Sequence, residues 1–335
     1  MRRLRVALIW GGMGREHDVS RMGAMNLLSV LDKKKFNVHS VYIDKKGYWH
    51  LFGGRGEPIY PARGDRGGVL SGDGGRVAID VALPLLHGDF GEDGRVQGAL
   101  ECAGIPYVGC GVLAGAVASD KILTKMIAES LGIPTARSVS LTSQDTADAR
   151  QKCEEYIGYP MFIKPSGLGS SVGCSRVLFP EDFDAAYKAA AECGERVLAE
   201  EYIEGAREIE CAYSNTSRFG EIYAPPGEVV PRGVYTYRAK YSASTTARVL
   251  PRAELTAKVS ECAEKYSRLL VRAIGISQLG RIDYFLKDDR LILNEINTMP
   301  GFTKGSLYAA MLAECGIELS ELLTSLIEDA HDRRF

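Results

Sequence analysis

The first 44 residues constrain the fold most strongly, because they alternate a strand, a helix and a second strand. Arg5–Trp10 is a short apolar run that ends at Gly11, which is typical of a strand followed by a turn. Apolar residues recur at helical spacing in Ser20–Asp32, and Asn37–Asp44 returns to a strand pattern. A strand–helix–strand unit of this length pairs its strands in parallel, so the sequence predicts an α/β fold with a parallel sheet near its start.

The rest of the chain continues this pattern. Asp80–Leu86 is apolar on both faces, which predicts a further, central strand of the parallel sheet. The nine glycines between Gly53 and Gly75 predict an irregular surface excursion without a core of its own. We predict three domains: an N-terminal parallel α/β domain at 1–109, a central α+β sub-domain at 110–203 and a C-terminal α+β domain at 204–335.

Composition excludes several classes of function. The net charge is −2, so the chain has no electrostatic footprint for nucleic acid or an anionic membrane. No apolar run approaches the ~20 residues of a membrane span, and the apolar run at the start is too short for a signal peptide, so we expect a cytoplasmic protein. The eight cysteines include no Cys-x-x-Cys pair, which favours buried thiols over zinc or disulfides.

Two adjacent segments near the C-terminus carry a candidate metal site. Side chains alternate along a strand, so Arg281 and Asp283 share one face, and so do Glu295 and Asn297. If the strands form a hairpin that turns at Lys287–Arg290, Asp283 lies beside Glu295 and Asn297. Two carboxylates and an amide oxygen are a hard ligand set suited to Mg²⁺. The alternative is a solvated hairpin face, but the apolar neighbours of Glu295 indicate a buried strand, where unpaired carboxylates would be costly.

A loop rich in glycine and serine follows the predicted strand at 161–164. Lys164 precedes three glycines and three serines in 166–173. Glycines let backbone N–H groups approach an anion, and the lysine supplies a point charge, so the loop is a candidate phosphate site. It is not a Walker A loop, because there the lysine follows the glycines. A flexible hairpin turn explains the same residues, and the loop alone leaves both readings open.

Three further segments have roles that the local sequence leaves open. Glu16 either caps the helix that follows the first strand, which the local sequence favours, or holds the ammonium group of a ligand. His87, in the loop after Asp80–Leu86, is either a satisfied loop histidine or a catalytic group. In Leu198–Gly205, polar residues such as Glu200 alternate with apolar ones, which fits an adenine-binding segment or an amphipathic edge strand.

Taken in order, these segments resemble the D-alanine–D-alanine ligases of the ATP-grasp superfamily, over essentially the whole chain. The matching motifs are GGMGREHDVS, LHGDFGEDG, SDK at 119–121, IKPSGLGSSVG, AKY at 239–241, GRID, NEINTMPG and the pair Ser306-Leu307. The resemblance implies an ATP-grasp fold and a two-step reaction that serves peptidoglycan precursor synthesis. ATP phosphorylates the carboxylate of one D-alanine, and the amine of a second D-alanine attacks the acyl phosphate.

The resemblance also implies the residues that bind ATP and metal. Phosphoryl transfer depends on positioning and charge neutralisation, which two Mg²⁺ ions, or Mn²⁺ as a substitute, would supply. The metal ligands would be Asp283, Glu295 and Asn297. The phosphates would contact three lysines: Lys121, Lys164 and Lys240. The adenosine would be bound by a third set: Glu200, Glu201, Ile203 and, on the ribose, Glu208. Many relatives carry lysine or glutamine at position 201, so we expect the acid there to turn toward adenine or solvent.

For the first substrate and the intermediate, the resemblance implies two groups of residues. Arg281 and the backbone N–H of Gly301 would form an oxyanion site for the tetrahedral intermediate. Glu16 would hold the ammonium of the first D-alanine and would be linked through Ser170 to Tyr241.

For the second substrate, the hydroxyl of Ser306 and the N–H of Leu307 would hold the carboxylate of D-alanine, with His87 nearby. A lid at 228–248 would exclude water and protect the acyl phosphate. Relatives that make D-alanyl-D-lactate carry histidine where this chain has Tyr241. Tyr241 and Leu307 therefore both indicate D-alanine as the acceptor.

Two alternatives remain. One is a D-alanine–D-serine ligase or another ATP-grasp carboxylate–amine ligase, which differs in the acceptor pocket around Tyr241 and Leu307. The other is a module that senses ATP without turnover, but such a module has no need of an oxyanion arginine such as Arg281. The resemblance implies a homodimer, with D-alanine and ATP as small-molecule ligands.

Overall fold

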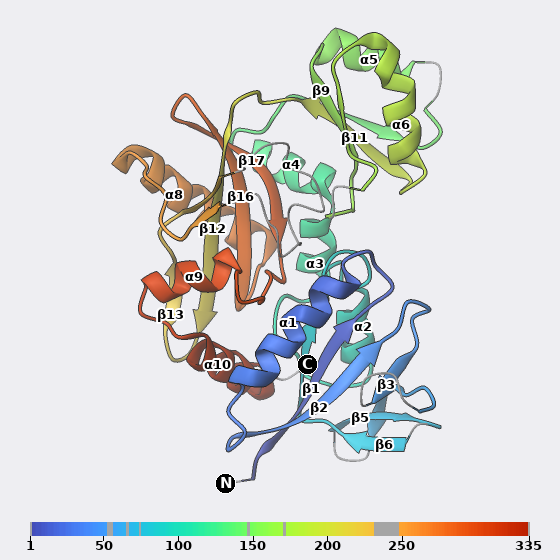
Figure 1. The fold of residues 1–335 in the computed structure, drawn as a ribbon, viewed down its shortest axis with the longest axis vertical. Coiled ribbons are helices and arrows are strands. Elements are labelled where there is room, and N and C mark those ends of the chain that lie inside the picture. Colours follow the sequence, from blue (N-terminus) through green and yellow to red (C-terminus); the bar gives the residue numbers. More distant parts are fainter. Residues whose placement is uncertain are drawn as a thin grey trace.

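The computed structural model describes residues 2–51, 56–64, 67–73, 75–145, 148–169, 172–230 and 248–333. Figure 1 shows an N-terminal region (blue), a central region (green) and a C-terminal region (yellow to red), each built around a sheet of its own. Within the described ranges, no helix combines the length and the apolar character needed to cross a membrane.

The N-terminal sheet contains the predicted strand–helix–strand unit. β1 (Leu4–Gly11) pairs in parallel with β2 (Phe36–Ile43), and α1 (His17–Val30) connects them. The sheet order is β3-β2-β1-β7, with β3 at Trp49–Leu51 and β7 at Val81–Leu85. β7 is fully buried as predicted, but it is the last strand of this sheet and not a central one, because only a single bridge from Ala82 to Tyr107 continues the pairing.

The glycine-rich segment corrects the prediction of an irregular excursion. It contains an antiparallel sheet of β4 (Tyr60–Gly64), β5 (Gly67–Gly72) and β6 (Gly75–Ala78). The fully buried side chains of Ile59 and Leu70 join the core beneath the N-terminal sheet. The prediction was wrong because a few apolar residues among the glycines are enough to anchor this sheet to a core supplied by other segments.

The central region has an antiparallel sheet in the order β10-β9-β11-β8. Its strands are β8 (Ser138–Thr142), β9 (Met161–Pro165), β10 (Ser175–Val177) and β11 (Arg196–Glu201). The helices before and around this sheet are α2 (Arg95–Cys102), α3 (Val112–Ser119), α4 (Lys121–Ser130), α5 (Ala149–Tyr156), η1 (Pro180–Asp182) and α6 (Phe183–Ala191).

The C-terminal region has a sheet in the order β15-β14-β12-β16-β17, with β13 paired to β12. Its strands are β12 (Arg207–Thr216), β13 (Gly220–Tyr223), β14 (Gly227–Val230), β15 (Arg248–Leu250), β16 (Leu279–Lys287) and β17 (Arg290–Asn297). Its helices are α8 (Ala257–Ile274), α9 (Leu307–Glu314) and α10 (Leu319–Asp332). β14 and β15 begin and end the predicted lid, whose residues 231–247 lie outside the described part of the chain.

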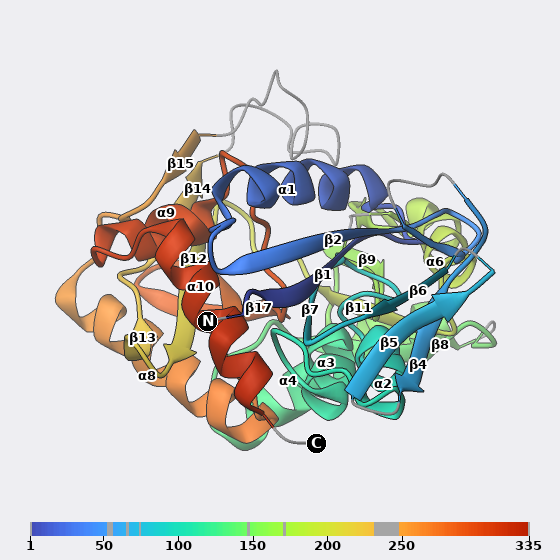
Figure 2. The ribbon, with the colours of Figure 1, turned by 90° about the horizontal axis from the view of Figure 1, so that it is seen from below.

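One hydrophobic core joins the two ends of the chain. Val6 and Leu83 of the N-terminal sheet belong to the same buried cluster as Phe302, Tyr308 and Leu326. Figures 1 and 2 both place α10 beside the N-terminal sheet, and α10 contacts β7. This shared core holds the loop between β17 and α9 against the N-terminal region, where the candidate site lies.

Candidate active site

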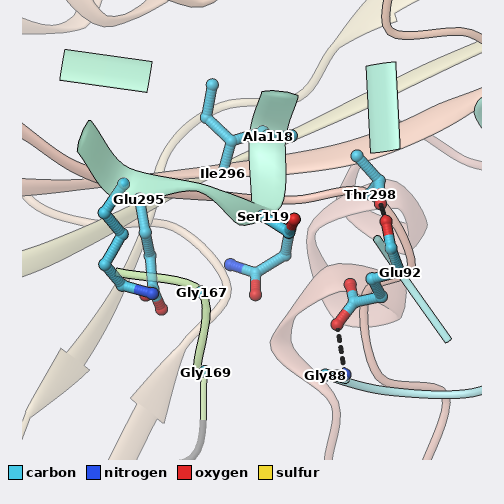
Figure 3. Close-up of a pocket in the computed structure, with 11 residues that line it drawn as sticks. Gly88, Glu92, Ala118, Ser119, Gly167, Gly169, Glu295, Ile296 and Thr298 are labelled. Atoms are coloured by element: carbon cyan, nitrogen blue, oxygen red, sulfur yellow. Dashed lines mark hydrogen bonds and ion pairs between the residues drawn. The ribbon is translucent and has the colours of Figure 1, made fainter. Parts of the chain in front are cut away.

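Four segments that are distant in sequence line one cavity, which has about 360 Å³ of empty volume. Gly88 and Glu92 come from the loop after β7, and Ala118, Ser119 and Lys121 from the α3–α4 junction. Gly167 and Gly169 come from the loop after β9, and Glu295, Ile296, Asn297 and Thr298 from the end of β17. In Figure 3, Glu295 and Glu92 lie on opposite sides, with Ser119 between them. The structure therefore brings together four of the motifs singled out in the sequence.

The predicted hairpin of acidic residues is confirmed. β16 and β17 are antiparallel and turn at 287–290, and Asp283 lies opposite Glu295. Asn297 Nδ2 donates to Asp283 Oδ2 at 3.0 Å, which leaves the amide oxygen of Asn297 as an acceptor. The three predicted metal ligands are thus neighbours on one hairpin, and Glu295 and Asn297 line the cavity.

Arg281 is fixed by carboxylates on its own face of the sheet. Its Nε and Nη2 donate to the two oxygens of Asp283, each at 2.7 Å, and its Nε lies 3.1 Å from Glu210 Oε2. Burial opposes the charge of Arg281, but Asp283 and Glu210 outweigh this effect and raise its pKa well above the ordinary value. Arg281 is therefore a permanently charged, preoriented cation beside the predicted metal ligand Asp283.

The position of Lys121 follows from how α4 begins. The side chain of Asp120 caps α4 by accepting from the N–H groups of Ile122 and Leu123, and Ser166 Oγ donates to the same carboxylate at 2.7 Å. These bonds tie the start of α4 to the loop after β9. Lys121 Nζ then lies 3.3 Å from Glu295 Oε2 and donates to the carbonyl of Leu168 at 2.8 Å.

A second group of buried charges lies on β9 and β11. Lys164 forms an ion pair with Glu200, and Lys125 Nζ lies 3.1 Å from the other oxygen of the same carboxylate. Burial opposes the charge of each group. The lysines outweigh burial at Glu200 and lower its pKa, Glu200 raises the pKa of Lys164, and at Lys125 burial prevails and lowers the pKa. The sequence analysis missed Lys125, although its spacing of four residues from Lys121 places both on one face of α4.

The residues predicted to contact adenosine, Glu200 included, are not among those that line the cavity. The carboxylate of Glu201, at the end of β11, pairs with Arg137 Nε at 3.0 Å. Arg137 also donates to the carbonyls of residues 156 and 157. Ile203 follows β11 and is partly buried, and Glu208 lies on β12 opposite Phe285.

Glu16 does not cap its helix with its side chain. It occupies the N-cap position of α1, but its carboxylate accepts no capping hydrogen bond, so the capping reading was wrong. A Cβ atom added to Gly88 would lie 2.6 Å from Glu16 Oε2, and one added to Gly169 would lie 3.7 Å away. The carboxylate therefore lies between the loop after β7 and the glycine-rich loop after β9.

The backbone of Met299 is held from both sides by the loop after β7. His87 Nδ1 donates to the Met299 carbonyl at 3.0 Å, and the Met299 N–H donates to Glu92 Oε1 at 2.9 Å. The Gly88 N–H donates to Glu92 Oε2 at 2.8 Å. We call this arrangement of His87, Glu92 and Met299 the Met299 clip. Sequence reasoning missed Glu92, whose only signal was its place in the LHGDFGEDG motif.

Burial shifts the pKa values of both acid–base groups in the Met299 clip. Burial and the nearby charge of Glu16 raise the pKa of Glu92 to about 8. Burial lowers the pKa of His87, so the ring is neutral with its proton on Nδ1. Its Nε2 has no hydrogen-bond partner among the described residues and remains an acceptor.

The acceptor-side residues lie at the start of α9. Ser306 is the N-cap residue of α9 and its hydroxyl donates to the Gly301 carbonyl, while Leu307 is the first, buried residue of the helix. The N–H groups in the first turn of a helix are suited to an anion such as a carboxylate. Three predicted site residues lie outside the described part of the chain: Ser170, Lys240 and Tyr241.

Family models and solved structures agree on the class of this protein. The model "D-ala D-ala ligase N-terminus" matches residues 5–110, and the model "D-ala D-ala ligase C-terminus" matches residues 127–328. The chain is 38% identical to D-alanine–D-alanine ligase A from Mesorhizobium japonicum, over 97% of each chain. It superposes on D-alanyl-alanine synthetase A from Vibrio cholerae with a TM-score of 0.90 and 33% identity, over 99% of this chain and 100% of the other.

A relative with a different acceptor has nearly the same fold. The VanG D-Ala:D-Ser ligase from Enterococcus faecalis matches with a TM-score of 0.85 and 28% identity, over 98% of this chain and 100% of that one. The fold is thus the ATP-grasp fold of ATP-dependent carboxylate–amine ligases. Within that class, the chain belongs to the D-alanine–D-alanine ligase family.

Proposed function

We propose that the chain joins two D-alanine molecules at the expense of ATP, through a D-alanyl phosphate intermediate. The observation that carries the proposal is the shared cavity, which brings Lys121 and Glu295 of the predicted nucleotide end to the loops that enclose Glu16. A carboxylate oxygen of the first D-alanine attacks the γ-phosphorus, and ADP leaves. The amine of the second D-alanine then attacks the acyl carbon, and the C–O bond to phosphate breaks.

The nucleotide end of the site fits phosphates and Mg²⁺. Two carboxylates and the amide oxygen of Asn297 are hard oxygen donors, and Glu295 and Asn297 line the cavity. Bound Mg²⁺ would neutralise charge on the transferring phosphoryl group. Asp283, Glu295 and Asn297 would hold it, while Lys121 and Lys164 would orient the phosphates.

The residues around the reacting carbon support the second step. Arg281 is charged and held in one orientation, so it meets the oxyanion of the tetrahedral intermediate without reorganisation. The Met299 clip holds the segment that leads to Gly301, whose N–H would be the second donor. The ammonium of the first D-alanine would pair with Glu16.

The acceptor end rests on α9. Its first N–H groups and the Ser306 hydroxyl would bind the carboxylate of the second D-alanine. The proposal includes the parts that depend on residues outside the described ranges, namely Ser170, Lys240 and Tyr241 with the lid. It also includes a cytoplasmic homodimer and a role in supplying peptidoglycan precursors.

The test is phosphate release from ATP and Mg²⁺ in the presence of D-alanine, D-serine, D-lactate or L-alanine, with the product identified by mass spectrometry. The proposal requires release that depends on D-alanine and a D-alanyl-D-alanine product. Arg281→Met should abolish this release, whereas Arg268→Met, at a partly buried arginine of α8 that does not line the cavity, is the matched control and should retain it. Release that needs D-serine beside D-alanine would keep the mechanism and change the acceptor. No stimulation by any of the four would refute the proposal.

A further inference from the structure

Two lysines share one buried carboxylate where α4 meets β9 and β11. Glu200 forms an ion pair with Lys164 through Oε1, and its Oε2 lies 3.1 Å from Lys125 Nζ. The side chains of all three residues are at most 6% exposed. The proposed chemistry uses Lys164 and Glu200 but gives no task to Lys125, although its side chain is also buried.

Lys164 alone could not neutralise the charge of Glu200 once nucleotide is bound. Its Nζ also lies 3.4 Å from Asn294 Oδ1, next to the predicted metal ligand Glu295, so it stands at the boundary between Glu200 and the phosphates. A triphosphate carries more negative charge than one carboxylate and would draw the ammonium of Lys164 toward it. Without another cation, Glu200 would then be a buried, unpaired charge, which is strongly unfavourable.

Lys125 is anchored where it can supply that cation. Its Nζ donates to the carbonyl of Ala136 at 3.1 Å, and its side chain is 3% exposed. It lies one turn beyond Lys121 on α4, about 6 Å further along the helix axis and away from the end that meets Glu295. Lys125 therefore stays beside Glu200 while Lys121 and Lys164 engage phosphates.

We propose that Lys125 is a positioning residue that holds Glu200 ionised and oriented as the acceptor for the exocyclic amine of adenine. The inference rests on the proposed assignment of Glu200 to the adenine. An ionised carboxylate only accepts hydrogen bonds, so it favours a base edge that donates from an amine. A base with a carbonyl at that position places its oxygen against the carboxylate oxygen, so two acceptors meet and the base is rejected. A base with only hydrogen at that position leaves the carboxylate without a hydrogen-bond donor. Lys125 thus sets the preference for ATP without touching the nucleotide.

The experiment compares three nucleotides by calorimetric titration of the full chain with Mg²⁺ and no D-alanine. ATP has the exocyclic amine, purine riboside triphosphate lacks it, and inosine triphosphate carries a carbonyl in its place. For the wild type we expect the order ATP, purine riboside triphosphate, inosine triphosphate. In Lys125→Met, affinity for ATP should fall roughly tenfold or more, because a charged hydrogen bond is weakened, while affinity for purine riboside triphosphate should change less than about threefold.

Matched variants keep the test independent of folding. Lys188→Met, on the exposed face of α6, is the control for the chemical change and should alter no affinity. If Lys125→Met folds poorly, Lys125→Arg is the substitute test. It keeps the charge and should retain most of the preference for ATP. In Glu200→Gln the preference should already be reduced, and adding Lys125→Met should then change it little.

Each outcome decides the matter. An equal loss of affinity for all three nucleotides in Lys125→Met would show that Lys125 is only structural and would overturn the inference. A wild type that does not distinguish ATP from purine riboside triphosphate, yet still releases phosphate with D-alanine, would overturn the inference and leave the proposed function standing. If the wild type prefers ATP through Lys125 but shows no turnover with D-alanine, the inference would stand and the proposed function would be overturned.

Discussion

The Met299 clip predicts a pH-dependent stability that a single substitution removes. Glu92 accepts one backbone N–H from Gly88 and one from Met299, and its pKa is raised to about 8 by burial and by the nearby charge of Glu16. The folded-state pKa lies above the ordinary value of 4.5, so between these values the folded protein keeps a proton that the unfolded chain releases. The stabilisation from Glu92 is therefore fully present below pH 4.5 and is lost as the pH rises through about 8.

The size of this effect follows from the pKa difference. A tenfold change in proton affinity is worth about 1.4 kcal/mol, so the rise from 4.5 to about 8 gives an upper bound of about 5 kcal/mol in the free energy of unfolding. Glu92 lines a cavity that is open to solvent, and screening by water reduces this bound. We expect the free energy of unfolding to change by about 1–3 kcal/mol between about pH 5 and about pH 9 because of Glu92.

Glu92→Gln removes the ionisable group of this side chain and keeps nearly the same shape. The amide is neutral at every pH, but its nitrogen cannot accept, so one backbone N–H of the Met299 clip loses its partner at a cost of about 1–3 kcal/mol. In urea unfolding followed by circular dichroism, the variant should therefore have a lower free energy of unfolding than the wild type near pH 5. The difference in free energy of unfolding between the two should narrow or reverse near pH 9. Glu129→Gln, at an exposed carboxylate on α4, is the matched control. If the difference in free energy of unfolding between Glu92→Gln and the wild type stayed constant from about pH 5 to about pH 9, the reasoning would be refuted.

Three other substitutions probe how the site is held. Asp120→Ala removes the cap of α4 and the bond from Ser166, and should lower the free energy of unfolding by about 2 kcal/mol in urea titrations. Gly88→Ala, at φ +65° and against the Glu16 carboxylate, should cost about 1–2 kcal/mol and raise the KM for the first D-alanine, measured by phosphate release. Arg281→Lys keeps the charge but loses the paired bonds to Asp283, so kcat should fall at least tenfold in the phosphate-release assay; an unchanged kcat would contradict its oxyanion role.

The parts of the site that the sequence predicted are those that local rules determine. Alternation along two strands was enough to place Asp283 beside Glu295 and Asn297, because an antiparallel hairpin with a short turn fixes which residues face each other.

The parts that it missed depend on contacts between segments far apart in the chain. Nothing near Glu92 indicates that it will meet Met299, which lies 207 residues later. Lys125 has the appearance of an ordinary helical lysine until β11 brings Glu200 to it. Local reasoning also favoured a capping role for Glu16, since it sees the helix start but not Gly88 and Gly169 across the cavity. The packing of distant segments determines the surroundings of all three residues, Glu92, Lys125 and Glu16.

The charges of the site are paired before any ligand arrives, and this pairing bears on how the site works. Lys121 lies against Glu295, Lys164 against Glu200 and Arg281 against Asp283, so these three cations, the ones within the described residues that are assigned to phosphate or oxyanion, already have carboxylate partners. A triphosphate entering alone would separate these pairs and leave buried carboxylates uncompensated, which is costly. A triphosphate entering with Mg²⁺ brings cations to the carboxylates and anions to the lysines in one exchange. The arrangement therefore favours the metal–nucleotide complex over free nucleotide. Among the described residues, Glu200 has a second lysine, Lys125, which stays beside it when Lys164 turns toward the phosphates.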